Sequence, residues 1–168
     1  MSTKKRPDIH TISILVANKP GVLVRCAQVF ARRGFNIDAL VVSPSVNPKF
    51  SRMTITASGD PGTLEQIIKQ TAKLIDVIHV GEHTGVDSVD REFALVKVKY
   101  TTSSKAAINK LLKKYHVKIA QVNEDVAIIQ QSGTTEELDS LENELKKYDV
   151  LEMVRSGKLV MAIGRKTT

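Results

Sequence analysis

The feature that most constrains the fold is an order of apolar patterns that occurs twice along the chain. In the first half, apolar runs with strand character lie at 11–17, 37–42, 51–57 and 74–80, and helical spacing is found over Gly21–Arg33 and after Asp60-Pro61. Alternation with period two predicts strands, and recurrence every three or four residues predicts helices. The first half therefore reads as strand, helix, strand, strand, helix, strand.

The second half repeats this order after residues 81–91, a segment rich in Gly, Asp, Glu and His. Its strands are expected at 93–100, 117–122, 126–131, 150–154 and 159–163, and its helices at 105–115 and 134–147. Two such units predict an α+β fold of two tandem ferredoxin-like βαββαβ domains, each an antiparallel sheet with helices on one face. The expected boundaries are 1–80 for the first domain with a short basic N-terminal tail, 81–91 for a linker, and 92–168 for the second domain.

The segment Asn18-Lys19-Pro20-Gly21 joins the first predicted strand to the first predicted helix, whose core positions would be Leu23, Cys26, Ala27 and Phe30. Free backbone N–H groups at the start of a helix, together with the helix dipole, can hold a carboxylate or a phosphate. The same tetrapeptide is a good turn by composition, and its asparagine can simply cap the helix. Taken alone, it leaves a binding site and a plain turn both open.

No catalytic, metal or cofactor site is expected from the residue pattern. The single cysteine, Cys26, lies on an apolar helix face and is interpreted as core, and one cysteine excludes a disulfide framework. His79 and His83 are four residues apart, but Gly81 lies between them at a predicted strand end, so solvated histidines are expected there. The chain also lacks a phosphate-binding glycine loop, an acidic cluster for magnesium and a nucleophile with a base.

The charges are arranged in two opposite blocks. The net charge is +7 and the isoelectric point is about 9.5, which raises the alternative of nucleic-acid binding. Residues 93–123 contain seven lysines and no acid, whereas 124–152 contain nine acids and two lysines. Because the two helices of a βαββαβ unit lie side by side, we expect these blocks to neutralise each other. The strands also offer few aromatic side chains for base stacking, so no nucleic-acid partner is expected.

One predicted strand indicates self-association. Helices cover only one face of each sheet, so the other face meets water, a partner or a second copy. Residues 37–42 are apolar on both sides of the strand, which favours burial against another subunit, and a homodimer is expected. No run approaches the roughly 18 apolar residues that a membrane span needs. A soluble, cytoplasmic protein without a membrane partner is therefore expected.

Several segments in the right order resemble one known family. They are Asn-x-x-Gly at 18–21, Arg-Arg-Gly-Phe-Asn-Ile at 32–37, Ser-Arg-Met-Thr-Ile at 51–55, Asp-Arg-Glu-Phe-Ala-Leu-Val-Lys-Val at 90–98 and Val-Arg-Ser-Gly at 154–157. The first three are similar to the amino-acid-binding ACT domain, specifically that of the regulatory (small) subunit of acetolactate synthase, also called acetohydroxyacid synthase. The last two strengthen that match. The resemblance covers nearly the whole chain, from His10 to Arg165.

The resemblance implies a non-catalytic protein. Small subunits of that family bind a separate thiamine-diphosphate-dependent catalytic subunit, raise its activity and make it sensitive to feedback inhibition by a branched-chain amino acid, commonly valine. The catalytic subunit makes acetohydroxyacids from pyruvate for valine, leucine and isoleucine synthesis. The alternative is a free-standing ACT-domain amino-acid sensor, or a transcription-linked regulator, without a synthase partner.

The resemblance also implies which residues bind the effector. N–H groups at Val22 and Leu23 would hold its carboxylate, Gly21 would let it approach the backbone, and Asn18 would contact both its ammonium and its carboxylate. In related ACT dimers, the position equivalent to Asn36 reaches the ligand from the neighbouring subunit. The expected effector-binding residues are Asn18, Gly21, Val22, Leu23, Asn36 and Ile37, where the side chains of Val22, Leu23 and Ile37 are candidates for the apolar pocket and equally for the core.

Overall fold

The computed structural model describes residues 9–83 and 87–165, so the expected basic N-terminal tail and the middle of the expected linker lie outside the described residues. The chain forms two compact units. The first consists of the described residues up to Asp90 together with those from Gly157 onward, and the second is Arg91–Ser156. Each contains an antiparallel sheet with helices, which confirms the predicted α+β fold of tandem ferredoxin-like domains.

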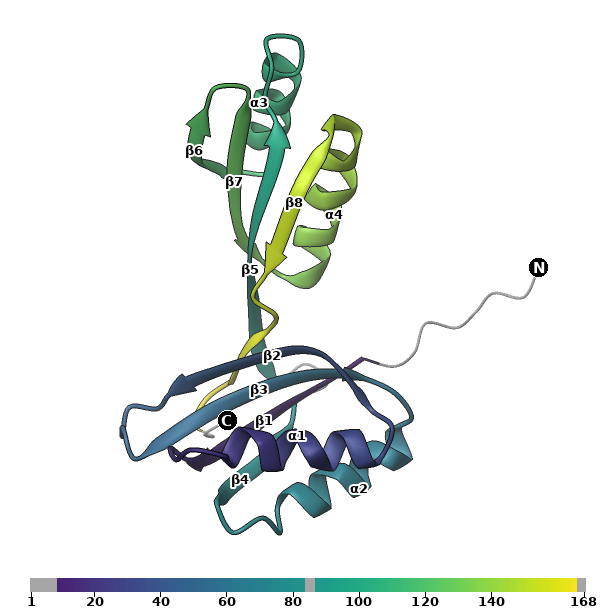
Figure 1. Ribbon diagram of the computed structural model, residues 1–168, viewed down its shortest axis with the longest axis vertical. Helices are drawn as coiled ribbons and strands as arrows, with labels where there is room; N and C mark the ends of the chain where they lie inside the picture. The colour runs from purple at the N-terminus through teal and green to yellow at the C-terminus, as the bar shows by residue number, and fades with distance from the viewer. Residues whose placement is uncertain (1–8, 84–86, 166–168) are drawn as a thin grey trace, which may run out of the picture. The chain divides into compact units, whose positions relative to one another are not determined.

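The first unit has a four-stranded antiparallel sheet in the order β2-β3-β1-β4. Its elements are β1 (Ile9–Ala17), α1 (Val22–Arg32), β2 (Asn36–Pro44), β3 (Phe50–Ser58), α2 (Pro61–Thr71) and β4 (Val77–Glu82). Both helices lie on one face of this sheet (Figure 1). The strand predicted at 74–80 begins later because the chain after α2 first makes a turn, in which Val77 N–H donates to the Leu74 carbonyl.

The core of the first unit lies between the sheet and its two helices. It contains alternate side chains of β1 and β3, such as Ile12, Ile14 and Ile55, together with Cys26 and Phe30 from α1. Cys26 is fully buried and burial raises the pKa of its thiol, so the interpretation of this residue as core is confirmed.

The phase of α1 differs from the sequence prediction by one residue at its start. Val22 is 2% exposed and belongs to the core, whereas Leu23, predicted as core, is 39% exposed. Apolar residues occupy three consecutive positions there, so spacing alone does not say which of them faces the sheet. Packing of α1 against the strands of the sheet determines which of these residues is buried.

The opposite side of the first sheet, which we call the far face, carries small polar side chains. Its buried hydroxyls are Thr11, Ser13, Thr54 and Thr56. The C-terminal segment covers part of this face, because a Cβ placed on Gly157 would lie 2.6 Å from the Ala39 Cβ. Gly157 also has φ +80°, which glycine adopts without strain.

The second unit repeats the architecture. Its elements are β5 (Ser88–Lys99), α3 (Lys105–Lys114), β6 (Lys118–Asn123), β7 (Val126–Gly133), α4 (Thr135–Leu145), a short 3-10 turn η1 (Lys146–Tyr148) and β8 (Val150–Arg155). The strand order is β6-β7-β5-β8, and β9 (Leu159–Ala162) pairs separately with β5. Helices α3 and α4 lie on one face of this sheet (Figure 1). The predicted capping box at the start of α4 is confirmed, with Thr134 and Glu137 bonded reciprocally.

The C-terminal boundary differs from the expected one. Residues from Gly157 onward were assigned to the second domain, but they cluster with the first unit. Ile163 N–H donates to the Asp87 carbonyl at 2.9 Å, and the Lys158 ammonium lies 2.8 Å from the Asp90 carboxylate. Because β5 begins at Ser88, strand pairing to its first residues draws the last strand away from the second unit.

The two charge blocks meet within the second unit, as predicted. Lysines of the basic block pair with acids of the acidic block, as Lys97 with Glu152, Lys99 with Asp149 and Lys114 with Glu144. The last of these pairs joins α3 to α4. All three are exposed, so each stabilises the unit only weakly.

Candidate functional site

The candidate site lies where β1 ends and α1 begins. Gly21 is the residue before the helix and has φ +82°, in the left-handed region that strongly favours glycine. It has no side chain to cap the helix, and the N–H groups of Leu23 and Val24 have no partner among the described residues. The N–H of Val22 makes only a long contact, 3.5 Å, with the Lys19 carbonyl. The helix therefore begins with unused donors and the positive end of its dipole.

A guanidinium adds to the positive character of this junction. Arg25 lies one helical turn after Gly21, and its Nη1 atom would be 3.2 Å from a Cβ at Gly21. Its Nη2 donates to the Asp76 carboxylate at 2.5 Å, which holds the side chain in place. The sequence analysis did not identify Arg25. Its position four residues after Gly21 could have indicated this role, because residues four apart lie on the same face of a helix.

Asn18 connects the junction to the loop between β2 and β3. Its backbone N–H donates to the Lys49 carbonyl at 2.8 Å, and its side-chain amide donates to the Pro48 carbonyl at 3.1 Å. The side-chain oxygen has no hydrogen bond among the described residues and remains an acceptor. Asn18 does not cap α1 with its side chain.

The apolar candidates near the junction separate into exposed and buried residues. Val22 packs in the core and cannot line an open pocket with its side chain, whereas the side chain of Leu23 is accessible. Ile37 is half-buried and packs against the same core. The sequence analysis allowed each of the three to line the apolar pocket or to lie in the core. The orientation of α1 and the register of β2 decide between these two places.

Within one chain, Asn36 lies far from Asn18. Asn36 is opposite Ser58 at one end of β3, whereas the residue before Asn18, Ala17, is opposite Phe50 at the other end. Eight residues of extended strand span roughly 26 Å, so the two asparagines cannot share a ligand in one protomer. The Asn36 amide instead donates to the Asp38 carboxylate at 3.0 Å.

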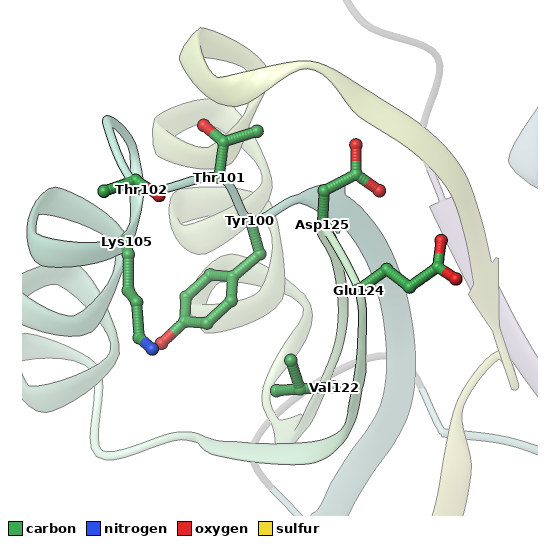
Figure 2. Close-up of a pocket in the computed structure, with 7 residues that line it drawn as sticks. All are labelled: Tyr100, Thr101, Thr102, Lys105, Val122, Glu124 and Asp125. Atoms are coloured by element: carbon green, nitrogen blue, oxygen red, sulfur yellow. The ribbon is translucent and has the colours of Figure 1, made fainter.

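The corresponding junction of the second unit has different chemistry. A cavity of about 350 Å³ lies beside the start of α3 and is lined by Tyr100, Thr101, Thr102, Lys105, Val122, Glu124 and Asp125. Figure 2 shows that the carboxylates of Glu124 and Asp125 project on one side of this cavity, away from Lys105. The Lys105 ammonium lies 5.6 Å from the centre of the Tyr100 ring.

His79 of β4 is exposed, as expected for a solvated histidine, but His83, the residue directly after β4, is not simply solvated, which corrects the expectation for that residue. His83 is half-buried, and its Nε2 atom lies 2.7 Å from the Ser13 hydroxyl. A strand also places every second side chain on one face, so His79 and His83 point to the same side. In the part of the chain that the structure describes, no three His, Cys, Asp or Glu residues gather as a metal-binding group. No helix in that part is both long and apolar enough to cross a membrane.

The family comparisons cover both units. Residues 12–79 match the family described as the AHAS small subunit-like ACT domain, and residues 91–165 match the family described as the small subunit of acetolactate synthase. The chain is 40% identical to a probable acetolactate synthase small subunit of Archaeoglobus fulgidus, over 94% of this chain and 98% of the relative. It is 39% identical to the acetolactate synthase small subunit of Mycolicibacterium smegmatis, over 92% and 91%.

A solved structure has the same fold over nearly the same length. The crystal structure of the acetolactate synthase small subunit from Thermotoga maritima matches with a TM-score of 0.85 at 37% identity, covering 95% of this chain and 99% of that one. Sequence and structure thus lead to one family, and both units take part in the match. This chain belongs to the acetolactate synthase small subunit family and carries its regulatory ACT domain.

Proposed function

We propose that this chain is a non-catalytic regulatory subunit that activates the catalytic subunit of acetolactate synthase and makes it sensitive to a branched-chain amino acid. The observation that carries the effector site is the uncapped start of α1, where Gly21 at φ +82° leaves the N–H groups of Leu23 and Val24 free. Membership of the small subunit family supports the catalytic partner.

The effector's carboxylate is bound by the free donors of the first helical turn. Leu23 N–H and Val24 N–H donate to it, and the Arg25 guanidinium lies close enough to add a favourable charge. The sequence analysis expected Val22 and Leu23 as the donors. Because Val22 N–H already contacts the Lys19 carbonyl, the proposed donors are instead Leu23 and Val24. The Asn18 oxygen accepts from the effector's ammonium, and the exposed Leu23 side chain contacts its apolar part.

A second copy of the chain completes the site in this proposal. Asn36 cannot reach the junction of its own protomer, so it would contact an effector held by a partner. The edge position of β2 supports a homodimer through the first unit, because Leu40 and Val42 on this strand are 36% and 41% exposed. A site shared between two subunits couples effector binding to the geometry of the dimer.

The second unit is proposed to bind the catalytic subunit. On the face of its sheet away from α3 and α4, three apolar side chains of β5 and β8 are exposed: Phe93 at 41%, Leu95 at 38% and Val154 at 57%. Leu95 and Val154 are direct strand neighbours. An apolar strand face of this kind is usually covered in the assembled protein.

The effector acts by favouring one arrangement of the dimer. A ligand shifts such an equilibrium only by its differential affinity for the two arrangements, and coupling energies of this kind are typically about 1–3 kcal/mol. Valine is the effector we propose. Valine, leucine and isoleucine differ by branching or one methylene, which an apolar pocket distinguishes by only about 1–3 kcal/mol, so weaker inhibition by the other two is expected.

The proposal is tested by mixing the purified chain with the thiamine-dependent catalytic subunit and measuring acetolactate formation with and without valine. We expect co-purification, higher activity on mixing and loss of that gain with valine. A Leu95→Glu variant should lose activation and retain valine binding, measured by calorimetry. Valine binding without any activation by the unmodified chain would instead indicate a free-standing amino-acid sensor.

A further inference from the structure

A cluster of basic side chains lies on the far face of the first sheet, away from the proposed effector junction. Strand β4 forms an edge of this sheet, and its residues His79 and Gly81, followed by His83 directly after the strand, alternate onto the far face. His79 is opposite Leu15 and Gly81 is opposite Ser13 in the neighbouring strand β1. Nothing in the proposed regulation by valine uses this cluster.

The missing side chain of Gly81 leaves a gap between the two imidazoles. A Cβ on this glycine would lie 3.5 Å from Nε2 of His79 and 3.7 Å from Nε2 of His83. The Nε2 atoms of both rings therefore lie near the same point, the place that this Cβ would occupy. Ser13, opposite Gly81 on the neighbouring strand, is 1% exposed, and its hydroxyl is 2.7 Å from Nε2 of His83.

A permanent positive charge lies beside this gap. Arg52 is opposite Leu15 on β3, so Arg52 and His79 flank the same residue on the far face. Arg52 is half-buried, and its guanidinium has no hydrogen bond or ion pair within residues 9–83 and 87–165. A partly buried guanidinium normally finds an acceptor, and here none of the described residues supplies it.

We propose that Arg52, His79 and His83 form a binding site for a small dianionic oxyanion, such as inorganic phosphate or sulfate. On the far face Arg52 is opposite Leu15 and Ser43, and His79 is opposite Leu15, so no carboxylate is among these register partners. A metal ion would meet the repulsion of the guanidinium, whereas an oxyanion accepts hydrogen bonds from Arg52, from His79 and from the Ser13 hydroxyl, to which the protonated His83 ring donates. This site is distinct from the proposed effector site and does not depend on it.

Proton uptake accompanies binding at this site. Burial lowers the pKa of His83, the charges of Arg52 and His79 lower it further, and only Glu82 opposes them. The Glu82 carboxylate is held by His10, at 3.0 Å from its Nδ1 atom. A bound dianion stabilises the protonated imidazole and raises its pKa, so affinity for the anion must increase as the pH falls.

The test follows the histidine ring signals by NMR in the full-length protein during titration with sulfate, at constant ionic strength kept with sodium chloride. Sulfate is chosen because it stays a dianion across the pH range used. We expect saturable shifts of the His79 and His83 signals, unchanged His10 and His116 signals, and about tenfold tighter binding at pH about 5.5 than at about 8. Equal movement of all four histidines would overturn the proposal, because it would indicate a general salt effect.

Two variants and one matched control distinguish a specific sulfate site from general attraction to a positively charged surface. Arg52→Met keeps the aliphatic stem and should weaken sulfate binding at least about tenfold, whereas Arg32→Met, which removes an exposed arginine of α1, should leave it unchanged. Gly81→Val fills the gap with a residue suited to a strand and should abolish binding without lowering the unfolding temperature. Unchanged binding in Arg52→Met or Gly81→Val would overturn the site.

Titration with phosphate and with acetate tests the class of anion. Phosphate should behave like sulfate at the pH where it is mainly dianionic. Acetate should bind at least about tenfold more weakly, because it carries one charge and presents two oxygens instead of four. Equal affinity for acetate would overturn the assignment to a dianion. Gly21→Asp should leave sulfate binding unchanged, so failure of this site and failure of the valine site are distinguishable.

Discussion

The first helix of each unit begins without a side-chain cap, but different chemistry surrounds the two helix ends. Neither α1 nor α3 has a side-chain cap, whereas α2 is capped by Asp60 and α4 by Thr134. The repeated strand order thus produces an uncapped helix end twice. What can bind at each end is decided by the few residues around it.

The residue directly before the helix differs between the two junctions. Gly21 has no side chain, and the Leu23 and Val24 N–H groups are free. In the second unit, the Ser104 hydroxyl donates back towards the Lys99 carbonyl at 3.2 Å and accepts from Thr101 N–H at 3.0 Å. The comparison shows that topology alone does not make a carboxylate site.

Acidic residues add a second difference. Glu124 and Asp125 line the cavity beside α3, and their charges repel a carboxylate that approaches the helix end. Beside α1, the Asp76 carboxylate is bound to Arg25 at 2.5 Å. The first junction is therefore suited to an amino-acid carboxylate and the second is not.

The largest effect is expected at a buried ion-pair network of the second unit. The Arg155 guanidinium binds Glu92, whose side chain is 7% exposed, and also Asp139 at 2.5 Å. Arg155→Met leaves the buried Glu92 carboxylate without a cation, bound only by the Thr135 hydroxyl, and should destabilise the second unit by about 3–5 kcal/mol. Hydrogen exchange of the β5, β8 and α4 amides measures this, and the first unit's core amides serve as the internal reference.

A double-mutant cycle shows whether the loss comes from the orphaned charge. Glu92→Gln combined with Arg155→Met should be less destabilising than the sum of the two single changes. The surface pair offers a matched control, because Lys99→Met removes an exposed partner of Asp149 and should cost less than about 1 kcal/mol. A cost for Arg155→Met as small as the control's would mean that the buried network contributes little.

The second prediction tests the first junction directly. In Gly21→Asp, the new carboxylate can accept from the free N–H groups of Leu23 and Val24 and so occupy the place of the effector's carboxylate. Asparagine and aspartate tolerate the left-handed backbone better than most residues. Valine affinity should fall at least about 100-fold, roughly 2.7 kcal/mol, while activation of the catalytic subunit is retained.

Calorimetry with valine and the activity assay provide the two readouts for Gly21→Asp. Simultaneous loss of activation and valine binding would mean that the substitution damaged the fold, which circular dichroism checks. Retention of full valine inhibition would place the effector elsewhere and remove the distinction drawn between the two junctions.

The third prediction concerns the C-terminal segment, which belongs to the first unit. Gly157→Ala puts a Cβ against Ala39 and forces a side chain onto a residue with φ +80°. We expect a loss of about 1–3 kcal/mol in the first unit's stability. Gly164→Ala is the matched control, because Gly164 has φ +81° and no atom within 4 Å of its Cβ position. Equal losses for both would attribute the effect to backbone conformation alone.

The smallest effect is expected at the second junction. Ser104→Ala removes the hydroxyl that bonds Lys99 and Thr101, and a pair of ordinary hydrogen bonds is worth about 1–2 kcal/mol. Thermal unfolding should report this loss. Valine inhibition should be unchanged, and any weakening of it would show that the second junction takes part in regulation after all.

Local sequence patterns predicted most of the fold because they report local physics. Apolar alternation located the strands to within a few residues, and Asp60 and Thr134 were correctly identified as helix starts because their capping chemistry is encoded within four residues. The helix phase at Val22 and Leu23 was wrong by one residue. Three adjacent apolar residues gave no local reason to choose between them.

The candidate site was predicted only in part. Gly21 was identified because its neighbours on both sides are strongly patterned, and its positive φ is a local property of the chain. Arg25 was missed, since its position beside the junction depends on Asp76, which is 51 residues away in sequence. The segment of His79 and His83 was correctly predicted as a strand end, but the contact of His83 with Ser13 was missed because these residues are 70 positions apart in sequence.

The amino-acid sequence by itself determined the order of elements, the two-unit repeat, the glycine before α1 and the family, because propensity, capping and motif spacing depend on neighbours along the chain. The tertiary structure decided three other features. It separated Asn18 from Asn36 by the length of β3, brought the segment after Gly157 to the first unit, and gathered Arg52 with His79 and His83. Each of these depends on strand register and on pairing between distant residues, and a short stretch of sequence does not indicate such contacts.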